Sequence, residues 1–276
     1  EGEVTKKYLK KYYPKLSVNV GDVKLDKNYL KKQVNFDIAI KTPGINKKEL
    51  TIPYTTATNL FLSEVTGKYT TIGITGSKGK STTSTLIFEL LKDAGRPVVF
   101  LGNIGRPMLE VLLGPIKKNT IFVLELSSYQ LDDAEHSPHI ALITSLFPEH
   151  LDYHGNLENY FNAKKNVVNF QGPKDYFVFE PANKEVKKWL KDYRGIGVPF
   201  ADNIGLESSK LSLLGEHNMC NIRGAITVAK LLNVPDESIK KTLLQFKPLP
   251  HRLERVGEFG GITFYDDAIS TTPEST

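Results

Sequence analysis

The segment from Tyr69 to Ala94, YTTIGITGSKGKSTTSTLIFELLKDA, constrains the fold of this chain more than any other. Its β-branched and aromatic start predicts a strand over 69–75, and apolar residues recur at helical spacing in its second half. Between the two, Gly76 and Gly79 allow the backbone to approach an anion closely. A strand, a glycine loop and a helix in this order favour a phosphate-binding site over an ordinary glycine turn.

The side chains of this loop are suited to a nucleoside triphosphate. Lys80 can reach phosphoryl oxygens, and Ser81 or Thr82 offers a hydroxyl to a magnesium ion at the helix N-terminus. The glycine spacing differs from that of the standard P-loop, which has four residues between its two glycines. We nevertheless interpret the loop as an ATP site.

The composition indicates a globular chain. Its 276 residues can bury a sizeable core. No apolar run approaches the roughly 20 residues of a membrane span, and no apolar segment follows the charged start, so we expect a cytoplasmic protein without membrane insertion. The single cysteine, Cys220, can form neither an internal disulfide nor a CxxC metal site, and we expect it to pack in the core.

Positive charge is concentrated near the start of the chain, where residues 1–60 contain twelve lysines and six acidic residues. Lys6, Lys7, Lys10 and Lys11 fall on one helical face, a pattern that can attract nucleic acid. A solvated helix surface explains these lysines equally well. We therefore expect no nucleic-acid partner.

From residue 69 onward, strand and helix patterns alternate, which predicts a mainly parallel sheet covered by helices on both faces. The fold class we expect is α/β, with a P-loop-type central domain. The pattern predicts strands at 97–101, 121–126, 140–146 and 176–179, a hairpin at 204–214, and strands at 253–259 and 262–265. It predicts helices opening at Pro107 and Asn156 and over 185–193, 215–232 and 236–246.

The first 68 residues predict about half of a small α/β domain. We expect a helix that ends before Pro14, strands at 16–20 and 36–40, and a mixed connector at 45–68. The resulting division is a partial N-terminal domain at 1–66, a central domain at 67–266, and a linker to a further domain at 267–276.

Ligands of parallel sheets bind at the carboxyl ends of the strands, where this chain places several polar residues. Glu125 follows the apolar run IFVL, and a buried carboxylate costs several kcal/mol unless it meets a cation. A lysine could supply that cation, but we favour a magnesium ion facing the phosphates. Ser127 and Ser128 could cap a helix or hold a substrate oxygen.

His150 and Lys164 are weaker candidates on local grounds. Isolated histidines are more often structural than catalytic, but His150 shares a sheet edge with Glu125, which favours a catalytic role. Lys164, in YFNAKK, would by itself be an ordinary solvated helix residue.

Five motifs occur in a characteristic order: TGSKGKST, GNIGRP, ELSSYQL, PEHLDYHG with YFNAKK, and GEHNMCN followed by LPHRLE. Together they resemble the Mur ligases, the ATP-dependent amide-bond-forming enzymes of peptidoglycan synthesis. The resemblance covers Phe36 to Asp267. ELSSYQL with GNIG is most similar to the branch that joins D-glutamate to UDP-N-acetylmuramoyl-L-alanine.

The resemblance implies an N-terminal domain for the UDP moiety, a central ATPase and a C-terminal dinucleotide-fold domain, of which only the central one is complete here. It also implies two magnesium ions. Lys80 would hold the β and γ phosphates, Glu125 with Ser81 or Thr82 would bind one metal ion, and His150 the other. Lys164 falls where the family has a lysine carbamylated by carbon dioxide, which places an anion at the metal site.

Further roles follow from the same resemblance. Asn103 and Ser127 would contact the muramoyl-alanine end of the substrate. The nucleotide would be held by the loop residues Gly76, Ser77, Lys78, Gly79, Lys80, Ser81 and Thr82, by Asn218 and Asn221 at the adenine, and by Arg252 and Asp267 at the ribose and phosphate, with His251 beside them. Lys78 replaces the usual asparagine of the loop. We expect a monomer, although no pattern in the sequence sets the oligomeric state.

Three alternatives remain open. The tail YDDAISTTPEST differs from the NDSKATN-like sequence of the usual D-glutamate enzymes, because Ile269 replaces a lysine and Thr272 an asparagine. A branch that adds L-glutamate is therefore possible. A folylpolyglutamate-synthetase-like ligase would share the central domain but needs a different substrate loop. A non-catalytic nucleotide-binding module is the alternative from another class.

Overall fold

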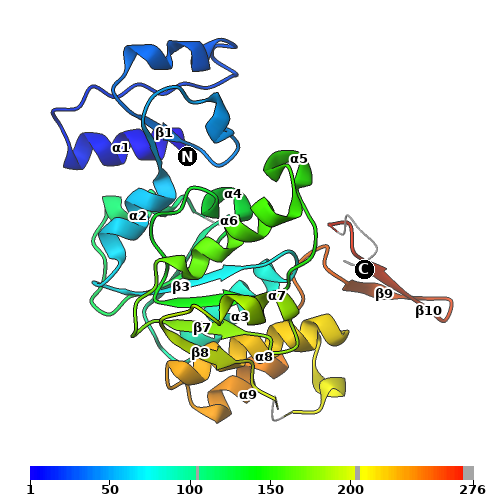
Figure 1. The fold of residues 1–276 in the computed structure, drawn as a ribbon. Coiled ribbons are helices and arrows are strands. Elements are labelled where there is room, and N and C mark those ends of the chain that lie inside the picture. Colours follow the sequence, from blue (N-terminus) through cyan, green and yellow to red (C-terminus); the bar gives the residue numbers. More distant parts are fainter. Residues whose placement is uncertain (104–105, 203–205, 270–276) are drawn as a thin grey trace.

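A six-stranded parallel sheet forms the centre of the computed structural model, which describes residues 1–103, 106–202 and 206–269 (Figure 1). The strand order is β4–β5–β3–β6–β7–β8, and neighbouring strands all run parallel. The predicted α/β class is confirmed. The strands are β3 (Thr70–Thr75), β4 (Val98–Gly102), β5 (Ile121–Glu125), β6 (Ile140–Ile143), β7 (Tyr176–Phe179) and β8 (Ile196–Pro199).

The sheet has a topological switch point at β3. After β3 the chain first builds β4 and β5 on one side of that strand and then β6 to β8 on the other. Connections that leave in opposite directions open a crevice at the carboxyl end of the central strand. Ile74 of β3 pairs with Glu125, which also pairs with Gly102 of β4, so that the loops after three strands meet there.

Helices cover both faces of the sheet because its strands are apolar on both sides. In β5, Phe122 and Leu124 belong to one core, and Ile121 and Val123 to the other. The first core includes α2 (Ala57–Val65), α6 (Leu157–Asn169) and α7 (Lys184–Trp189). The second includes α3 (Lys80–Asp93), α8 (Glu216–Leu231) and α9 (Asp236–Gln245), which lie on the opposite side of the sheet in Figure 1.

The N-terminal region packs above the sheet and differs in part from the prediction. Helix α1 (Gly2–Tyr12) ends before Pro14 as expected. The predicted strand at 16–20 is wrong: these residues belong to none of the described strands, and Leu16 is exposed. Their alternating pattern forms no strand pairing in the described sheets. The described elements that follow are the 3₁₀ helix η1 (Tyr29–Asn35), β1 (Ala39–Lys41), the 3₁₀ helix η2 (Lys47–Glu49) and β2 (Tyr54–Thr56).

The connector expected at 45–68 in fact contains both β2 and α2. β2 pairs in parallel with β1, and Thr56 caps α2 by accepting a hydrogen bond from the Asn59 amide. The polar threonine run that suggested a connector therefore includes a helix cap. Strand β8 was not predicted either.

Several other boundaries differ from the prediction. The hairpin at 204–214 is wrong: 204–205 lie outside the described residues, and the rest contains the 3₁₀ helix η4 (Ser208–Lys210), with Leu211 and Leu213 buried in the second core instead of paired in a strand. The helix after Pro107 is the 3₁₀ helix η3 (Met108–Leu113). Short helices α4 (Ser128–Leu131) and α5 (Leu151–His154) follow β5 and β6.

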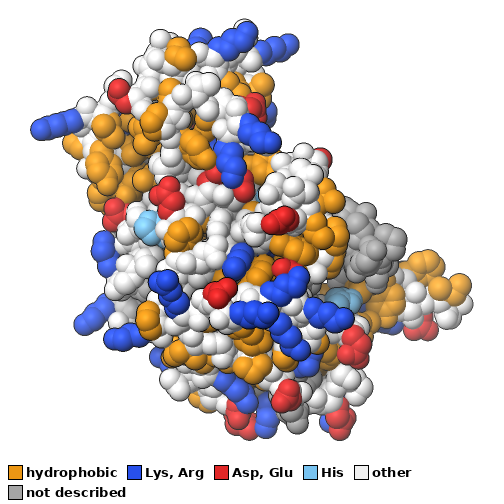
Figure 2. All heavy atoms as spheres, in the orientation of Figure 1, with side chains coloured by type: hydrophobic (Ala, Val, Ile, Leu, Met, Phe, Trp, Pro, Cys, Tyr) orange, Lys and Arg blue, Asp and Glu red, His pale blue; other side chains and the backbone are white. Residues whose placement is uncertain are grey.

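The hairpin of β9 (Glu254–Phe259) and β10 (Ile262–Asp266) forms as predicted and projects from the body of the molecule at the right of Figure 1. Apolar side chains gather along it in Figure 2, and Val256, Phe259 and Ile262 are well exposed. The predicted linker lies mostly outside the described residues, as does Thr272.

Two predictions from composition can be compared with the structure. Cys220 packs at the edge of the second core, but it is only half-buried and its thiol donates to Glu180 Oε2 at 3.3 Å. In the part of the chain that the structure describes, no helix combines the length and the apolar character that a membrane crossing requires.

Candidate active site

The loop between β3 and α3 adopts a conformation that only glycine allows at two positions. Gly76 has φ +151° and Gly79 has φ +84°. A Cβ atom on Gly76 would lie 2.0 Å from Thr144 Oγ1, and one on Gly79 would lie 2.3 Å from Asn221 Oδ1. Both glycines are thus required by close packing as well as by backbone geometry.

The loop is tied to the segment that follows β6. The Ser77 amide donates to Ser145 O at 2.8 Å, and the Lys78 amide donates to Ser145 Oγ at 2.9 Å. The Ser77 hydroxyl donates to Phe147 O at 2.7 Å and lies 3.0 Å from the Tyr160 hydroxyl. These contacts explain why β6 ends at Ile143 and not at 146 as predicted, because the next residues bind the loop instead of a strand.

Two lysines converge on one carbonyl of this loop. Lys80 Nζ donates to Gly76 O at 2.9 Å and to Ser77 O at 2.8 Å, and Lys164 Nζ donates to Gly76 O at 2.7 Å. Burial lowers the pKa of Lys80. Burial lowers the pKa of Lys164 more strongly, and the positive charge of Lys80 acts in the same direction.

Lys164 is only 1% exposed, and its ammonium lies 4.8 Å from the centre of the Tyr160 ring. No carboxylate of the described residues comes within ion-pair distance of it. A buried cation without an anionic partner is costly, which is why burial lowers the pKa of Lys164 and disfavours its charged form.

Glu125, also 1% exposed, has neutral partners. Its carboxylate accepts hydrogen bonds from Asn103 Nδ2 at 3.0 Å and from Ser84 Oγ at 3.4 Å. Among the described residues, no lysine or arginine forms an ion pair with it. The alternative of a lysine-paired carboxylate is therefore not observed. Oxygen ligands beside a phosphate loop fit a hard divalent cation.

His150 precedes α5 as its N-cap residue and has a left-handed conformation, with φ +52°. Its ring lies 5.1 Å from Tyr129 and 6.5 Å from Tyr160. Burial lowers the pKa of His150, and the charges of Lys164 and Lys80 lower it further. The imidazole is thus favoured in its neutral form, the form that can bind a metal ion.

The hairpin base approaches the start of α3 through Arg252, whose guanidinium donates to Ser81 Oγ at 3.1 Å. Asp267 accepts a hydrogen bond from the Leu253 amide at 3.2 Å. The predicted phosphate contacts Arg252, Asp267 and the loop are therefore neighbours, although they are far apart in the sequence.

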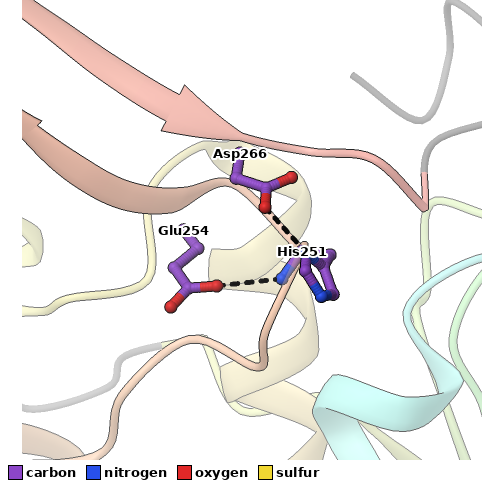
Figure 3. Close-up of side chains that lie close together, drawn as sticks. All are labelled: His251, Glu254 and Asp266. Carbon is purple, nitrogen blue, oxygen red and sulfur yellow. Dashed lines mark hydrogen bonds and ion pairs between the residues drawn. The ribbon is translucent and has the colours of Figure 1, made fainter.

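His251 lies beside these residues. Its Nδ1 is 2.7 Å from Asp266 Oδ2, and its amide donates to Glu254 Oε2 at 3.0 Å, as Figure 3 shows. Single ligand-type atoms of the three side chains come within 4.8 Å of one another. All three are at least partly exposed, and the histidine is already hydrogen-bonded to both carboxylates. We therefore interpret the cluster as a set of hydrogen bonds that ties the base of β9 to β10, and not as a metal site.

Asn218 and Asn221 lie on α8 beneath the loop. Both are buried, Asn221 Nδ2 donates to Asn218 Oδ1 at 3.2 Å, and Asn218 donates to Leu214 O at 2.7 Å. Asn221 also faces Gly79. Their predicted contact with adenine stays a prediction.

Asn103 and Ser127 line a cavity of about 340 Å³ together with Gly102, Tyr129, Pro43 and other residues. Ser127 also caps α4, since its Oγ accepts a hydrogen bond from the Gln130 amide at 3.3 Å. The hydroxyl therefore serves as a helix cap at the edge of a cavity that could hold a ligand. Ser128 donates to or accepts from His154 Nε2 at 3.0 Å.

Sequence reasoning missed some residues that shape this site. Tyr160 contacts both Ser77 and Lys164, while Thr144 and Ser145 hold the loop. No local pattern separates them from core residues. Lys78, expected to add charge near the phosphates, forms an ion pair with Glu149 at 2.8 Å, and Thr82 is buried in the first turn of α3.

Comparison with known proteins finds relatives of one family. Residues 74–207 match the model of the Mur ligase middle domain. A UDP-N-acetylmuramoylalanine–D-glutamate ligase of Oenococcus oeni is 36% identical over 272 residues, which cover 88% of this chain and 61% of the relative. The chain spans about three fifths of the length of the curated relatives it matches.

Solved structures show the same fold at lower identity. MurF from Acinetobacter baumannii superposes with a TM-score of 0.64 at 19% identity, over 90% of this chain and 63% of that one. The MurF ligase of Thermotoga maritima in complex with ADP superposes with a TM-score of 0.62 at 19% identity, over 86% and 63%.

Proposed function

We propose that this chain, which belongs to the Mur ligase family, forms the ATP-dependent part of a ligase that joins glutamate to UDP-N-acetylmuramoyl-L-alanine in peptidoglycan synthesis. One observation carries the proposal. Two lysines meet at Gly76 O, and at the same sheet edge the buried carboxylate of Glu125 has no basic partner within the described part of the chain. The lysine side of this edge can receive an anion and the Glu125 side can receive a cation, and a magnesium nucleotide supplies both.

The phosphates of ATP fit the cationic side of the site. Lys80 now donates to two loop carbonyls, and it would turn to the β and γ phosphates. Arg252 lies at Ser81 in the first turn of α3, where helix amides also favour an anion. Lys78 adds a further charge beside Glu149.

A magnesium ion fits the anionic side. Glu125 and the Ser81 hydroxyl would hold one ion and His150 a second, with Lys164 nearby. A bound cation neutralises charge that develops on the transferring phosphoryl group. Glu125 meets only an amide and a hydroxyl among the described residues, which supports this role.

Lys164 fits carbamylation, because only a neutral amine adds to carbon dioxide. Its burial and its lowered pKa favour that neutral amine. The carbamate would replace a disfavoured cation by an anion facing Lys80 and the metal sites. The change in charge gives a reason for placing a lysine at this buried position.

The muramoyl-alanine carboxylate would enter from the cavity lined by Asn103 and Ser127. One of its oxygens attacks the γ-phosphorus of ATP, the bond to the β,γ-bridging oxygen breaks, and ADP leaves. The amine of glutamate then attacks the acyl carbon, forming the amide and releasing inorganic phosphate and a proton. Lys80 stabilises the phosphoryl charge in the first step.

The domain division at 1–66, 67–266 and 267–276 is part of this proposal, as are the cytoplasmic location and the monomeric state. The D-glutamate relatives support D-glutamate as the amino acid that is added. Ile269, however, replaces the lysine of their usual tail, which leaves the handedness of the glutamate to be tested. L-Glutamate is the competing substrate.

The deciding experiment measures phosphate release by the full-length protein with ATP, magnesium, UDP-N-acetylmuramoyl-L-alanine and either enantiomer of glutamate. We expect turnover with D-glutamate and its loss in Lys80→Ala, with Lys92→Ala, an exposed lysine of the same helix, as the control. Turnover with L-glutamate alone would correct the enantiomer. ATP binding without turnover on any glutamate acceptor would favour the non-catalytic module instead.

A further inference from the structure

A buried ion pair joins the N-terminal region to the sheet at some distance from the phosphate loop. Lys41 Nζ, at the end of β1, lies 2.6 Å from Asp133 Oδ2, just after α4. The side chains are 0% and 5% exposed. Among the described residues neither atom has another hydrogen-bond partner, so the Lys41 charge is neutralised by Asp133. The other carboxylate oxygen, Asp133 Oδ1, also lies 4.0 Å from the half-exposed Lys47 Nζ.

Asp133 is a meeting point for other groups of the N-terminal region. Its Oδ1 accepts a hydrogen bond from the Tyr54 hydroxyl at 3.0 Å, and its carbonyl accepts one from Asn59 Nδ2 at 2.8 Å. Burial and the bond to Asp133 raise the pKa of Tyr54 to about 12, which keeps it a donor. β1, β2 and α2 thus all contact one residue at the end of α4.

The two ends of this ion pair continue into two walls of the same cavity. Lys41 is followed by the turn that contains Pro43 and Gly44, closed by the Ile45 amide donating to Thr42 O at 3.1 Å. Asp133 follows α4, whose N-cap Ser127 and first-turn residue Tyr129 form a second wall in the lining of this cavity. The walls are more than eighty residues apart in the sequence.

We propose that the Lys41–Asp133 pair is a positioning element that holds these two walls at the spacing needed for the UDP-muramoyl substrate. This inference rests on the proposed function for the identity of the ligand. A buried pair suits the task, because sliding either wall would separate two charges in an apolar setting. A cavity with preorganised walls binds its ligand without first ordering them.

The pair and the phosphate loop contact different elements, so the inference predicts a split between the two substrates. In full-length Lys41→Met/Asp133→Asn, which removes both charges together and keeps an acceptor for Tyr54, we expect the KM for UDP-N-acetylmuramoyl-L-alanine to rise at least tenfold. The KM for ATP should stay within twofold. The two single variants should raise the first KM non-additively, because the pair acts as a unit.

Lys47→Met is the matched control. It removes the pair of Lys47 Nζ with Asp132 Oδ2 at 3.0 Å and a longer contact with Asp133 Oδ1 at 4.0 Å, and the Lys47 side chain is 43% exposed. It therefore tests whether an exposed lysine near the same carboxylate has the effect expected of the buried Lys41. Both KM values should stay within twofold, since an exposed pair fixes little. Equal rises of both KM values in the charge-removing double variant, or no rise in either, would overturn the positioning role.

Amide hydrogen exchange of the chain itself provides a readout that does not depend on turnover. In the double variant, amides at 44–46 and 128–131 should exchange at least several-fold faster than in Lys47→Met, while those of β3 stay unchanged. Unchanged exchange at both walls would refute the inference even if the enzyme is active. If the wild type lacks turnover but the exchange changes as expected, the positioning role of the Lys41–Asp133 pair is supported and the proposed substrate is wrong.

Discussion

Lys164 and Lys41 are both buried lysines, yet their surroundings are opposite. Lys164 beside the phosphate loop meets a carbonyl oxygen and an aromatic ring. Lys41 under the N-terminal region meets the carboxylate of Asp133 at 2.6 Å. Burial alone therefore does not distinguish the lysine that we propose to act in catalysis from the one that we propose to position the cavity walls.

The difference lies in how the charge is compensated. A buried charge matched by an opposite one is neutral as a pair, and its disruption mainly weakens the fold. A buried charge with no such partner costs free energy in the resting protein and is retained where a ligand or a covalent change completes it. Glu125 falls in the second class with Lys164, because only neutral groups bond to it.

The largest effect that we expect from this comparison is a loss of catalytic activity. In full-length Lys164→Ala, we expect ATP-dependent phosphate release to fall by at least about 1,000-fold, which is ~4 kcal/mol of transition-state stabilisation. Formate or acetate should restore part of the rate, since a small carboxylate can occupy the space of the carbamate.

Lys165→Ala is the matched control for this variant, because it removes the neighbouring lysine of α6. It should retain nearly full activity without additives. Full activity of Lys164→Ala would refute a catalytic role for Lys164 and would show that a buried lysine without an anionic partner need not be functional.

The two lysines also differ in how far the sequence could reveal them. The phosphate loop is contiguous, so Gly76, Gly79 and Lys80 could be placed from a local pattern. Lys164 was distinguished only by resemblance to a family, because its helical surroundings are those of a solvated residue. The pair of Lys41 with Asp133 gave no signal, since its members are 92 positions apart and each is ordinary in its own segment.

The same limit explains which elements were missed. β3 and α3 have strong local periodicity and formed as predicted. A strand at 16–20 would have needed a neighbouring strand, which no local pattern can predict. At 204–214 the alternating apolar residues Leu211 and Leu213 pack in the second core instead of pairing in a hairpin. Pairing and packing partners are properties of the whole fold.

The second prediction compares stability. Lys41→Met removes the close partner of the buried Asp133 carboxylate, which keeps only the Tyr54 hydroxyl and the more distant Lys47 Nζ at 4.0 Å among the described residues. We expect it to lower the free energy of unfolding by about 3 kcal/mol. Lys164→Met removes a buried amine whose charged form has no anionic partner among the described residues, and it should leave the free energy of unfolding unchanged or raise it. Urea unfolding of both variants, with equal m-values as a check on the two-state assumption, gives the measurement. A larger loss in Lys164→Met would invert the comparison.

A third, smaller effect is the pH dependence of Lys164. Its pKa in the folded protein lies below the ordinary 10.5, so between those two values the unfolded chain binds more protons. The stability of the wild type should therefore rise with pH up to 10.5, relative to Lys164→Met, which lacks this titration. Parallel stability curves for the two proteins between pH 7 and 10 would contradict the lowered pKa. Measurements are made without bicarbonate, so that the free amine is compared.

The smallest expected effect comes from a compensated pair at the surface, His251 with Asp266 (Figure 3). The hydrogen bond to Asp266 raises the pKa of His251, and the reciprocal bond lowers that of Asp266. The histidine contribution is complete below pH 6.5 and is lost as pH rises through the raised value, and the aspartate contribution is lost as pH falls below 3.8. The pair should thus be strongest between these limits.

The Asp266→Asn variant tests this pair. Because both groups are accessible to solvent, we expect a modest change in the pKa of His251, seen by NMR titration of its ring as a return toward 6.5. The neighbouring Glu254→Gln should displace it less, because Glu254 bonds the His251 amide and not its ring. An unchanged titration in Asp266→Asn would show that compensation at this exposed joint contributes nothing, and would restrict the contrast between paired and unpaired charges to the interior.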